Sequence, residues 1–157
     1  MKEPKIELLS PAGSFECLQA AIKGGADAVY FGVEQLNMRA KSVNSFTLND
    51  IKQIASISKA NGIMSYITLN TVIYEQDKQL LHTILTEVKQ HHIDAVIASD
   101  FAVIEYCNQL NIPLHISNQA NISHLEAVQF FSRFADTVVL ARELTLKQVE
   151  HISKEIK

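Results

Sequence analysis

The sequence predicts an α/β fold in which short buried strands alternate with helices. Six apolar runs, rich in valine and isoleucine, are each followed by a stretch with helical spacing, which is typical of parallel strands buried on both faces. These runs are Ile6–Leu9, Ala28–Val33, Ile63–Leu69, Ala95–Ala98, Ile112–Ile116 and Thr137–Ala141. Because the carboxyl ends of parallel strands meet at one rim, we expect the polar residues that follow these runs to lie together there.

The number of strand–helix units leaves two architectures open. A closed barrel of this type has eight units and typically about 250 residues. A chain of 157 residues with six units therefore forms either an open, doubly wound sheet or the first three quarters of a barrel. An unfinished barrel would expose edges on its first and sixth strands, and such edges invite pairing with a second copy of the chain.

Length and composition set broad limits on function. The chain is long enough for one domain with a full core, and we expect a single α/β domain over residues 1–157. A net charge of −3 and a pI near 6.0 give no overall basic field, so RNA binding would need a local patch or another part of a longer protein. The sequence shows no apolar signal segment and no run of membrane-spanning length, which predicts a soluble, cytoplasmic protein without a membrane partner.

The two cysteines give no sign of a metal centre. Cys17 and Cys107 lie far apart in sequence and form neither a CxxC pair nor a metal-binding spacing with histidine. We predict that both are small buried hydrophobic residues.

Capping signals locate most of the helices. Ser14 is predicted to cap the first helix, and Ser123–Glu126 and Thr145–Gln148 have the spacing of capping boxes at the starts of the fifth and sixth. The first three helices are predicted to run over about 14–24, 47–61 and 75–91.

An aspartate directly precedes the second, fourth and sixth strands. These residues are Asp27, Asp94 and Asp136. We expect each to accept hydrogen bonds from the turn that ends the preceding helix, at the end of the sheet away from the functional rim.

Two loops on the predicted rim have residues suited to binding anions. Ser10 and Gly13 precede the first helix, where glycine lets the backbone approach a ligand and the free helix amides favour phosphate or carboxylate. The loop 34–46 is long and carries Asn37 and Arg39, and this arginine could make a two-pronged contact with an anion. The alternatives are an ordinary capped turn at Gly13 and a solvated or ion-paired Arg39.

The next three strands also end in polar residues. We interpret Asn70, Ser117 and Gln119 as ligand-binding candidates, while Asp100 is a candidate general base or metal ligand that could equally cap the following helix. His115 alternates with Ser117 and Gln119, so the three are expected to share one face. A lone strand histidine is more often structural, and we interpret His115 in that way.

Arg142 and Glu143 close the sixth run. Neighbouring residues at a strand end point to opposite sides, so one can face a ligand while the other caps the next helix. We predict that Arg142 anchors an anion and that Glu143 is a second catalytic candidate. The sequence shows no Ser-His-Asp grouping, paired-carboxylate spacing or metal motif.

Six short motifs follow one another along the chain: Glu7–Ser14, Gly25–Gly32, Asn37–Ala40, Thr68–Thr71, His115–Gln119 and Val139–Leu144. Taken in order, they resemble the collagenase-like peptidase family U32. The resemblance implies a TIM-type (β/α) barrel and a family protein more than twice this long, of which the chain is the amino-terminal part. We therefore expect the chain alone to be inactive.

The resemblance implies two kinds of activity. Some family members are described as collagen-degrading peptidases. Others act in oxygen-independent hydroxylation of RNA bases or of a quinone precursor and carry an iron–sulfur cluster. The cysteines that hold this cluster lie in the later part of the family pattern, and neither Cys17 nor Cys107 matches them. The prephenate dependence of tRNA-hydroxylating relatives would suit Arg39 and Arg142 as anchors for a small carboxylate ligand. Part of an RNA-hydroxylating enzyme is the leading hypothesis, ahead of a peptidase and of a non-catalytic ligand-binding or assembly module.

Overall fold

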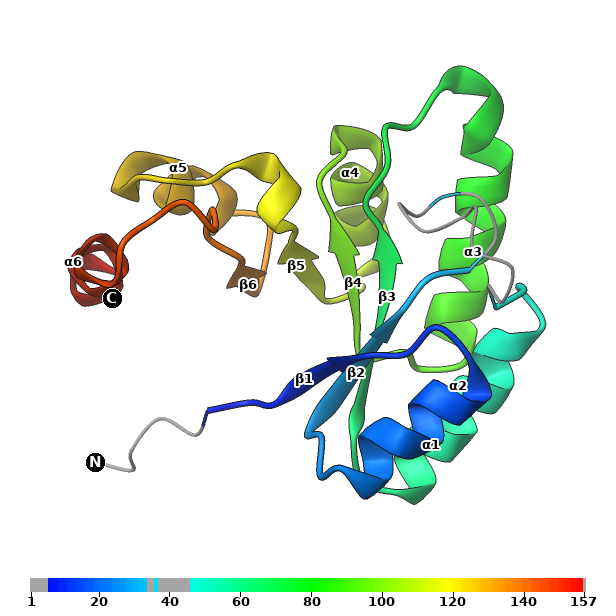
Figure 1. The fold of residues 1–157 in the computed structure, drawn as a ribbon. Coiled ribbons are helices and arrows are strands. Elements are labelled where there is room, and N and C mark those ends of the chain that lie inside the picture. Colours follow the sequence, from blue (N-terminus) through cyan, green and yellow to red (C-terminus); the bar gives the residue numbers. More distant parts are fainter. Residues whose placement is uncertain (1–5, 34–35, 37–45, 157) are drawn as a thin grey trace.

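The computed structural model describes residues 6–33, 36 and 46–156, and these form one parallel sheet of six strands (Figure 1). The strands lie in sequence order across the sheet, as β1 (Leu9–Pro11), β2 (Ala28–Phe31), β3 (Met64–Leu69), β4 (Ala95–Ala98), β5 (Leu114–Ile116) and β6 (Thr137–Val138). Each new strand is added next to the previous one, always on the same side of the sheet. In a doubly wound sheet the strand order reverses partway, so the first strand lies in the middle of the sheet. The fold is therefore a half-barrel with β1 and β6 at its two edges.

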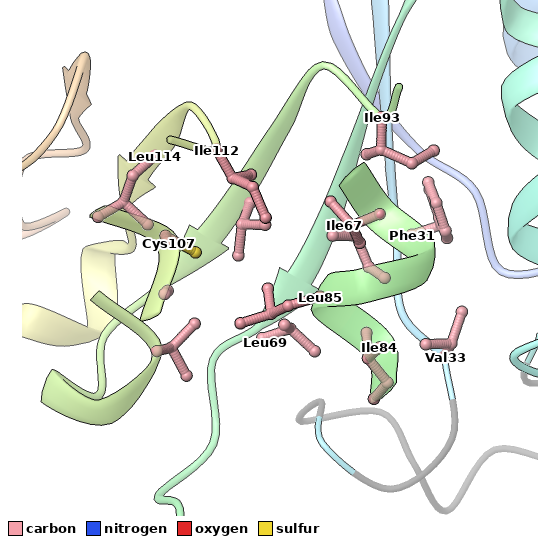
Figure 2. Packing of buried hydrophobic residues seen from close by; sticks show 14 of the residues in the cluster. Phe31, Val33, Ile67, Leu69, Ile84, Leu85, Ile93, Cys107, Ile112 and Leu114 are labelled. Atoms are coloured by element: carbon pink, nitrogen blue, oxygen red, sulfur yellow. The ribbon is translucent and has the colours of Figure 1, made fainter. Parts of the chain in front are cut away.

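Helices connect the successive strands and cover the outer face of the half-barrel. They are α1 (Phe15–Lys23), α2 (Asp50–Ala60), α3 (Lys78–Gln90), α4 (Phe101–Leu110), α5 (Leu125–Phe131) and α6 (Leu146–Glu155), with short 3₁₀ helices η1 (Glu75–Asp77) and η2 (Asn118–Ala120). Outward-facing strand residues pack against these helices in one buried cluster. At its centre, Ile67 and Leu69 of β3 contact the α3 layer formed by Ile84 and Leu85, all four without solvent exposure (Figure 2). Burial of each such side chain stabilises the fold by about 1.5–3 kcal/mol.

The alternate strand residues face the concave interior. Ala28, Tyr66 and Ala95 form a second, smaller buried cluster, and Tyr30 and Ile97 pack against it. Since side chains alternate along each strand, this cluster lies on the side of the sheet opposite the helices. This second cluster therefore faces the axis of the barrel.

Several predicted element limits are confirmed and others are wrong. Ser14 caps α1 through its hydroxyl, and the Thr145 capping box starts α6 as predicted. The predicted capping box at Ser123 is wrong, because His124 is the N-cap of α5 and its Nδ1 accepts the Ala127 N–H. The first strand also begins later than Ile6, since pairing with β2 starts only at Leu9.

The three aspartates lie at the amino ends of the strands, as predicted, but their partners differ from those expected. Asp94 accepts hydrogen bonds from the backbone N–H and the hydroxyl of Ser65, at 2.8 and 3.1 Å. Asp27 accepts from Leu8 N–H and Asp136 from Leu114 N–H. Each carboxylate therefore ties its own strand to the preceding strand in the sheet, and Asp94 and Asp136 do so in place of the expected bonds to the helix-ending turn.

Candidate functional site

The carboxyl ends of β3 and β4 come together at the rim. The Ser99 hydroxyl donates to the Asn70 carbonyl at 3.5 Å, and the Ile73 N–H donates to Asp100 Oδ2 at 3.1 Å. The other Asp100 oxygen accepts the Ala102 N–H at 2.8 Å and caps α4. Both carboxylate oxygens of Asp100 are thus bound to backbone amides, which is the helix-capping arrangement and fixes the β3–α3 loop to the start of α4.

The chain turns sharply after β5. Ser117 is buried; its N–H donates to the Ala98 carbonyl at 2.7 Å and its Oγ accepts the Gln119 N–H at 3.3 Å. Since η2 replaces the strand here, the alternation does not extend to Gln119, and the expectation that His115, Ser117 and Gln119 share one face is wrong. Gln119 Oε1 and Thr71 Oγ1 are buried at this rim without a partner in the described part of the chain, so each is available to a polar ligand.

The first rim loop is an ordinary capped turn in its geometry. Ser10 lies in register with Val29, whose side chain packs on the helices, so Ser10 is on the outer side of the sheet. Gly13 is exposed with open space around its α-carbon, which leaves the backbone accessible. The Ser14 hydroxyl already accepts one of the first helix amides, that of Cys17, at 3.2 Å.

Of the predicted arginine anchors, the structure describes only Arg142. Asn37 and Arg39 lie outside the described residues. Arg142 and Glu143 are exposed in the turn after β6, which is held by the Ala141 N–H donating to the Ile122 carbonyl at 2.8 Å. Both side chains therefore remain open to solvent on the β6 side of the rim.

A polar group on the concave face was missed by sequence reasoning. The Tyr66 hydroxyl donates to the Glu7 carboxylate, with both oxygens at 3.1 Å, and the Tyr66 ring meets the His115 ring edge-on with centroids 4.6 Å apart. Tyr66 is buried and His115 partly so. The only available signal was strand alternation, which puts Tyr66 and His115 on the face opposite the buried neighbours Ile67 and Ile116.

Burial sets the protonation of this group. It raises the pKa of Tyr66 to about 12, with a further contribution from Glu7, so the phenol stays protonated. Burial also lowers the pKa of His115, although the carboxylates of Glu7 and Asp136 act in the opposite direction. At neutral pH, His115 is therefore a neutral imidazole with one donor and one acceptor nitrogen.

The cysteines divide between surface and core. Cys107 is buried in α4, as predicted, and burial raises the pKa of its thiol to about 12. Cys17 is exposed in the first turn of α1, so the prediction of a buried residue is wrong there. Residues 6–33, 36 and 46–156 contain no group of three or more His, Cys, Asp or Glu side chains that could hold a metal ion. No helix among them is long and apolar enough to cross a membrane.

The fold and the rim define the class of protein: part of a (β/α) barrel with its polar residues at the carboxyl ends of the strands. Residues 13–157 match the profile of Peptidase family U32, and the chain belongs to this family. A similar solved structure, the U32 peptidase Mk0906, superimposes with a TM-score of 0.77 at 14% identity, covering 100% of this chain and 69% of that one. The expectation of an incomplete TIM-type barrel is confirmed.

Curated relatives carry two kinds of name. A protein of Porphyromonas gingivalis named collagenase is 51% identical over 96% of this chain and 36% of its own length. A Bacillus subtilis protein named tRNA hydroxylation protein P1 is 32% identical over 97% of this chain and 36% of its own length. The chain thus spans little more than a third of the length of these relatives.

Proposed function

We propose that this chain supplies the amino-terminal part of the catalytic barrel of a cytoplasmic U32 protein that acts in oxygen-independent hydroxylation of an RNA base. The observation that carries the proposal is the similarity to a tRNA hydroxylation protein along 97% of this chain, including every strand that builds the rim. The substrates and partners in this proposal belong to the full-length protein.

The rim offers groups that suit such a substrate. Gln119 Oε1 and Thr71 Oγ1 are buried without a described partner, and a nucleobase presents donors and acceptors that would satisfy them. Arg142, exposed in the turn after β6, and Arg39 are the proposed anchors for a small carboxylate ligand. Glu143 remains a catalytic candidate, whereas Asp100 is given the capping role.

The cysteines of this chain do not fit an iron–sulfur cluster. Such clusters need about four thiolates, and Cys107 is enclosed in the outer core while Cys17 is exposed at the start of α1. A cluster in the full-length protein would be held by cysteines outside this chain, and none of the roles proposed here passes through it.

A peptidase is the second candidate function. It is favoured by the name of the collagenase relative, which is 51% identical over 96% of this chain. A non-catalytic ligand-binding module is the third, and it would use the same rim without chemistry. The edges of β1 and β6 in this chain on its own would favour pairing with a second copy.

Modified nucleosides in RNA separate these functions. We expect RNA from cells that lack the full-length gene to lose one hydroxylated base, and the plasmid-borne gene to restore it. Purified full-length protein should leave gelatin intact under the same conditions. Unchanged nucleosides together with gelatin cleavage would reject RNA hydroxylation in favour of the peptidase, and neither activity would favour the ligand-binding module.

A further inference from the structure

The concave face of the sheet carries a polar group where a barrel normally has an apolar filling. Interior side chains of such barrels lie in layers supplied by alternate strands, and bulky branched apolar residues dominate these layers. Here the odd-numbered strands supply Glu7, just before β1, Tyr66 on β3 and His115 on β5. Polar groups in such positions need partners, either from the protein or from a ligand.

Tyr66 is the centre of this group. Its register partner on β4 is Ala95, a small residue that leaves room for the phenol ring above the sheet. The hydroxyl donates to Glu7 at 3.1 Å, and the ring supports His115 at an interplanar angle of 67°. One end of Tyr66 is thus fixed by a charged acceptor and its face by the imidazole, which holds both rings in place.

His115 occupies the position from which barrels usually act on their substrates. It is one residue from the end of β5, directly below the turn at Ser117, and its neighbours Leu114 and Ile116 face the helices. Catalytic side chains of these barrels come from the carboxyl ends of the strands. Neither ring nitrogen of His115 has a hydrogen-bond partner among residues 6–33, 36 and 46–156, so both are available to a molecule that enters from the rim.

We propose that His115 contacts the reacting nucleobase inside the barrel, and that Tyr66 and Glu7 are positioning residues that fix its ring. This inference rests on the proposed function and names the group that reads the base. A neutral imidazole has one hydrogen-bond donor and one hydrogen-bond acceptor, and so does the amide-like edge of a nucleobase. Enzymes that modify a base take it out of the stack and read that edge by hydrogen bonds and by contact with aromatic rings.

The titratable groups around His115 allow the positioning role of Glu7 to be tested through the pKa of His115. Glu7 lies before β1, Asp136 lies before β6, and the phenols of Tyr66 and Tyr30 lie on β3 and β2. Because the Glu7 carboxylate raises the pKa of His115, Glu7→Gln should lower that pKa further, and the neutral form should then persist to lower pH. Histidine NMR of the full-length protein measures this shift, with His115→Gln identifying the signal. An unchanged pKa in Glu7→Gln would overturn the positioning role.

Rescue of a gene-deleted strain tests the contact with the base. We expect His115→Phe in the full-length protein to restore the hydroxylated nucleoside at least roughly tenfold less well than wild type, because phenylalanine keeps an aromatic ring but loses both ring nitrogens and the hydrogen bonds that read a base. Tyr66→Phe should be intermediate, because it keeps the ring and loses the bond to Glu7. The matched control is His82→Phe, since the His82 ring also packs on a tyrosine ring, that of Tyr106 with centroids 4.1 Å apart, but on the helical surface.

The outcomes separate this inference from the proposed function. Protein levels and melting temperatures are measured for every variant, and His115→Leu replaces His115→Phe if the latter does not accumulate. Full rescue by a folded His115 variant overturns the inference and leaves RNA hydroxylation standing. If wild type itself restores no hydroxylated nucleoside, both the function and the base contact are wrong.

Discussion

Replacement of Asp94 by alanine tests the hydrogen bonds that tie neighbouring strands at their amino ends. The Asp94 carboxylate accepts from the Ser65 N–H at 2.8 Å and from the Ser65 hydroxyl at 3.1 Å. Ser65 is only 2% exposed, and the variant leaves its N–H and hydroxyl without this acceptor. A hydrogen bond to a charged group contributes about 1.5–3 kcal/mol, and part of the second bond overlaps the first, so we expect a loss of about 3 kcal/mol.

Amide hydrogen exchange of β3 in the full-length protein measures this loss locally. A change of about 3 kcal/mol should speed exchange of the β3 amides on the order of a hundredfold when exchange follows the opening equilibrium. Asp136→Ala, which removes the single 3.0 Å bond to Leu114 N–H, should have the smaller effect on its own strand pair. Glu155→Ala, an exposed change at the end of α6, is the neutral control. Exchange in Asp94→Ala within about twofold of wild type would refute the strand-tying role.

Three further predictions follow from single contacts. Thr145→Ala removes the N-cap of α6 and should cost about 1 kcal/mol, seen as faster exchange in α6, whereas exposed Lys147→Ala should change nothing. Leu85→Ala opens a cavity under α3 and should cost about 2–5 kcal/mol; a melting temperature equal to that of wild type would contradict the packing described. Arg142→Ala in the full-length protein should weaken the binding of a small carboxylate such as prephenate roughly tenfold, as measured by calorimetry. Arg133 lies over the Phe130 ring, and Arg133→Ala should leave this affinity unchanged. Equal affinities of wild type and Arg142→Ala would show that Arg142 is not the anchor.

The order of elements could be predicted from the sequence because it depends on local patterns. The apolar runs that became β2 to β5 are short, buried and separated by one-faced helices, and the caps at Ser14 and Thr145 are purely local hydrogen bonds. The limits of β1 could not be predicted in this way. Ile6 and Leu8 are as apolar as Leu9, yet only Leu9 faces a paired residue on β2.

The interior of the candidate site depends on contacts between distant parts of the chain. Tyr66 and Glu7 are 59 residues apart in sequence, and no local pattern predicts that their side chains meet. The alternation that correctly put His115 opposite Ile116 failed at Gln119, because a 3₁₀ turn follows the strand and changes the period. Cys17 was predicted buried by residue type alone, but its place in the first turn of α1 leaves it exposed.

Ultraviolet crosslinking of the full-length protein to cellular RNA tests most directly whether the carboxyl rim of this sheet faces the substrate. We predict RNA adducts on peptides that contain 99–101 or 117–121, at the ends of β4 and β5. The opposite end of the sheet provides the contrast, because a groove of about 600 Å³ there is lined by Lys52 and Lys59. Adducts confined to peptides of that groove, or no adducts at all, would contradict the rim as the RNA-binding side.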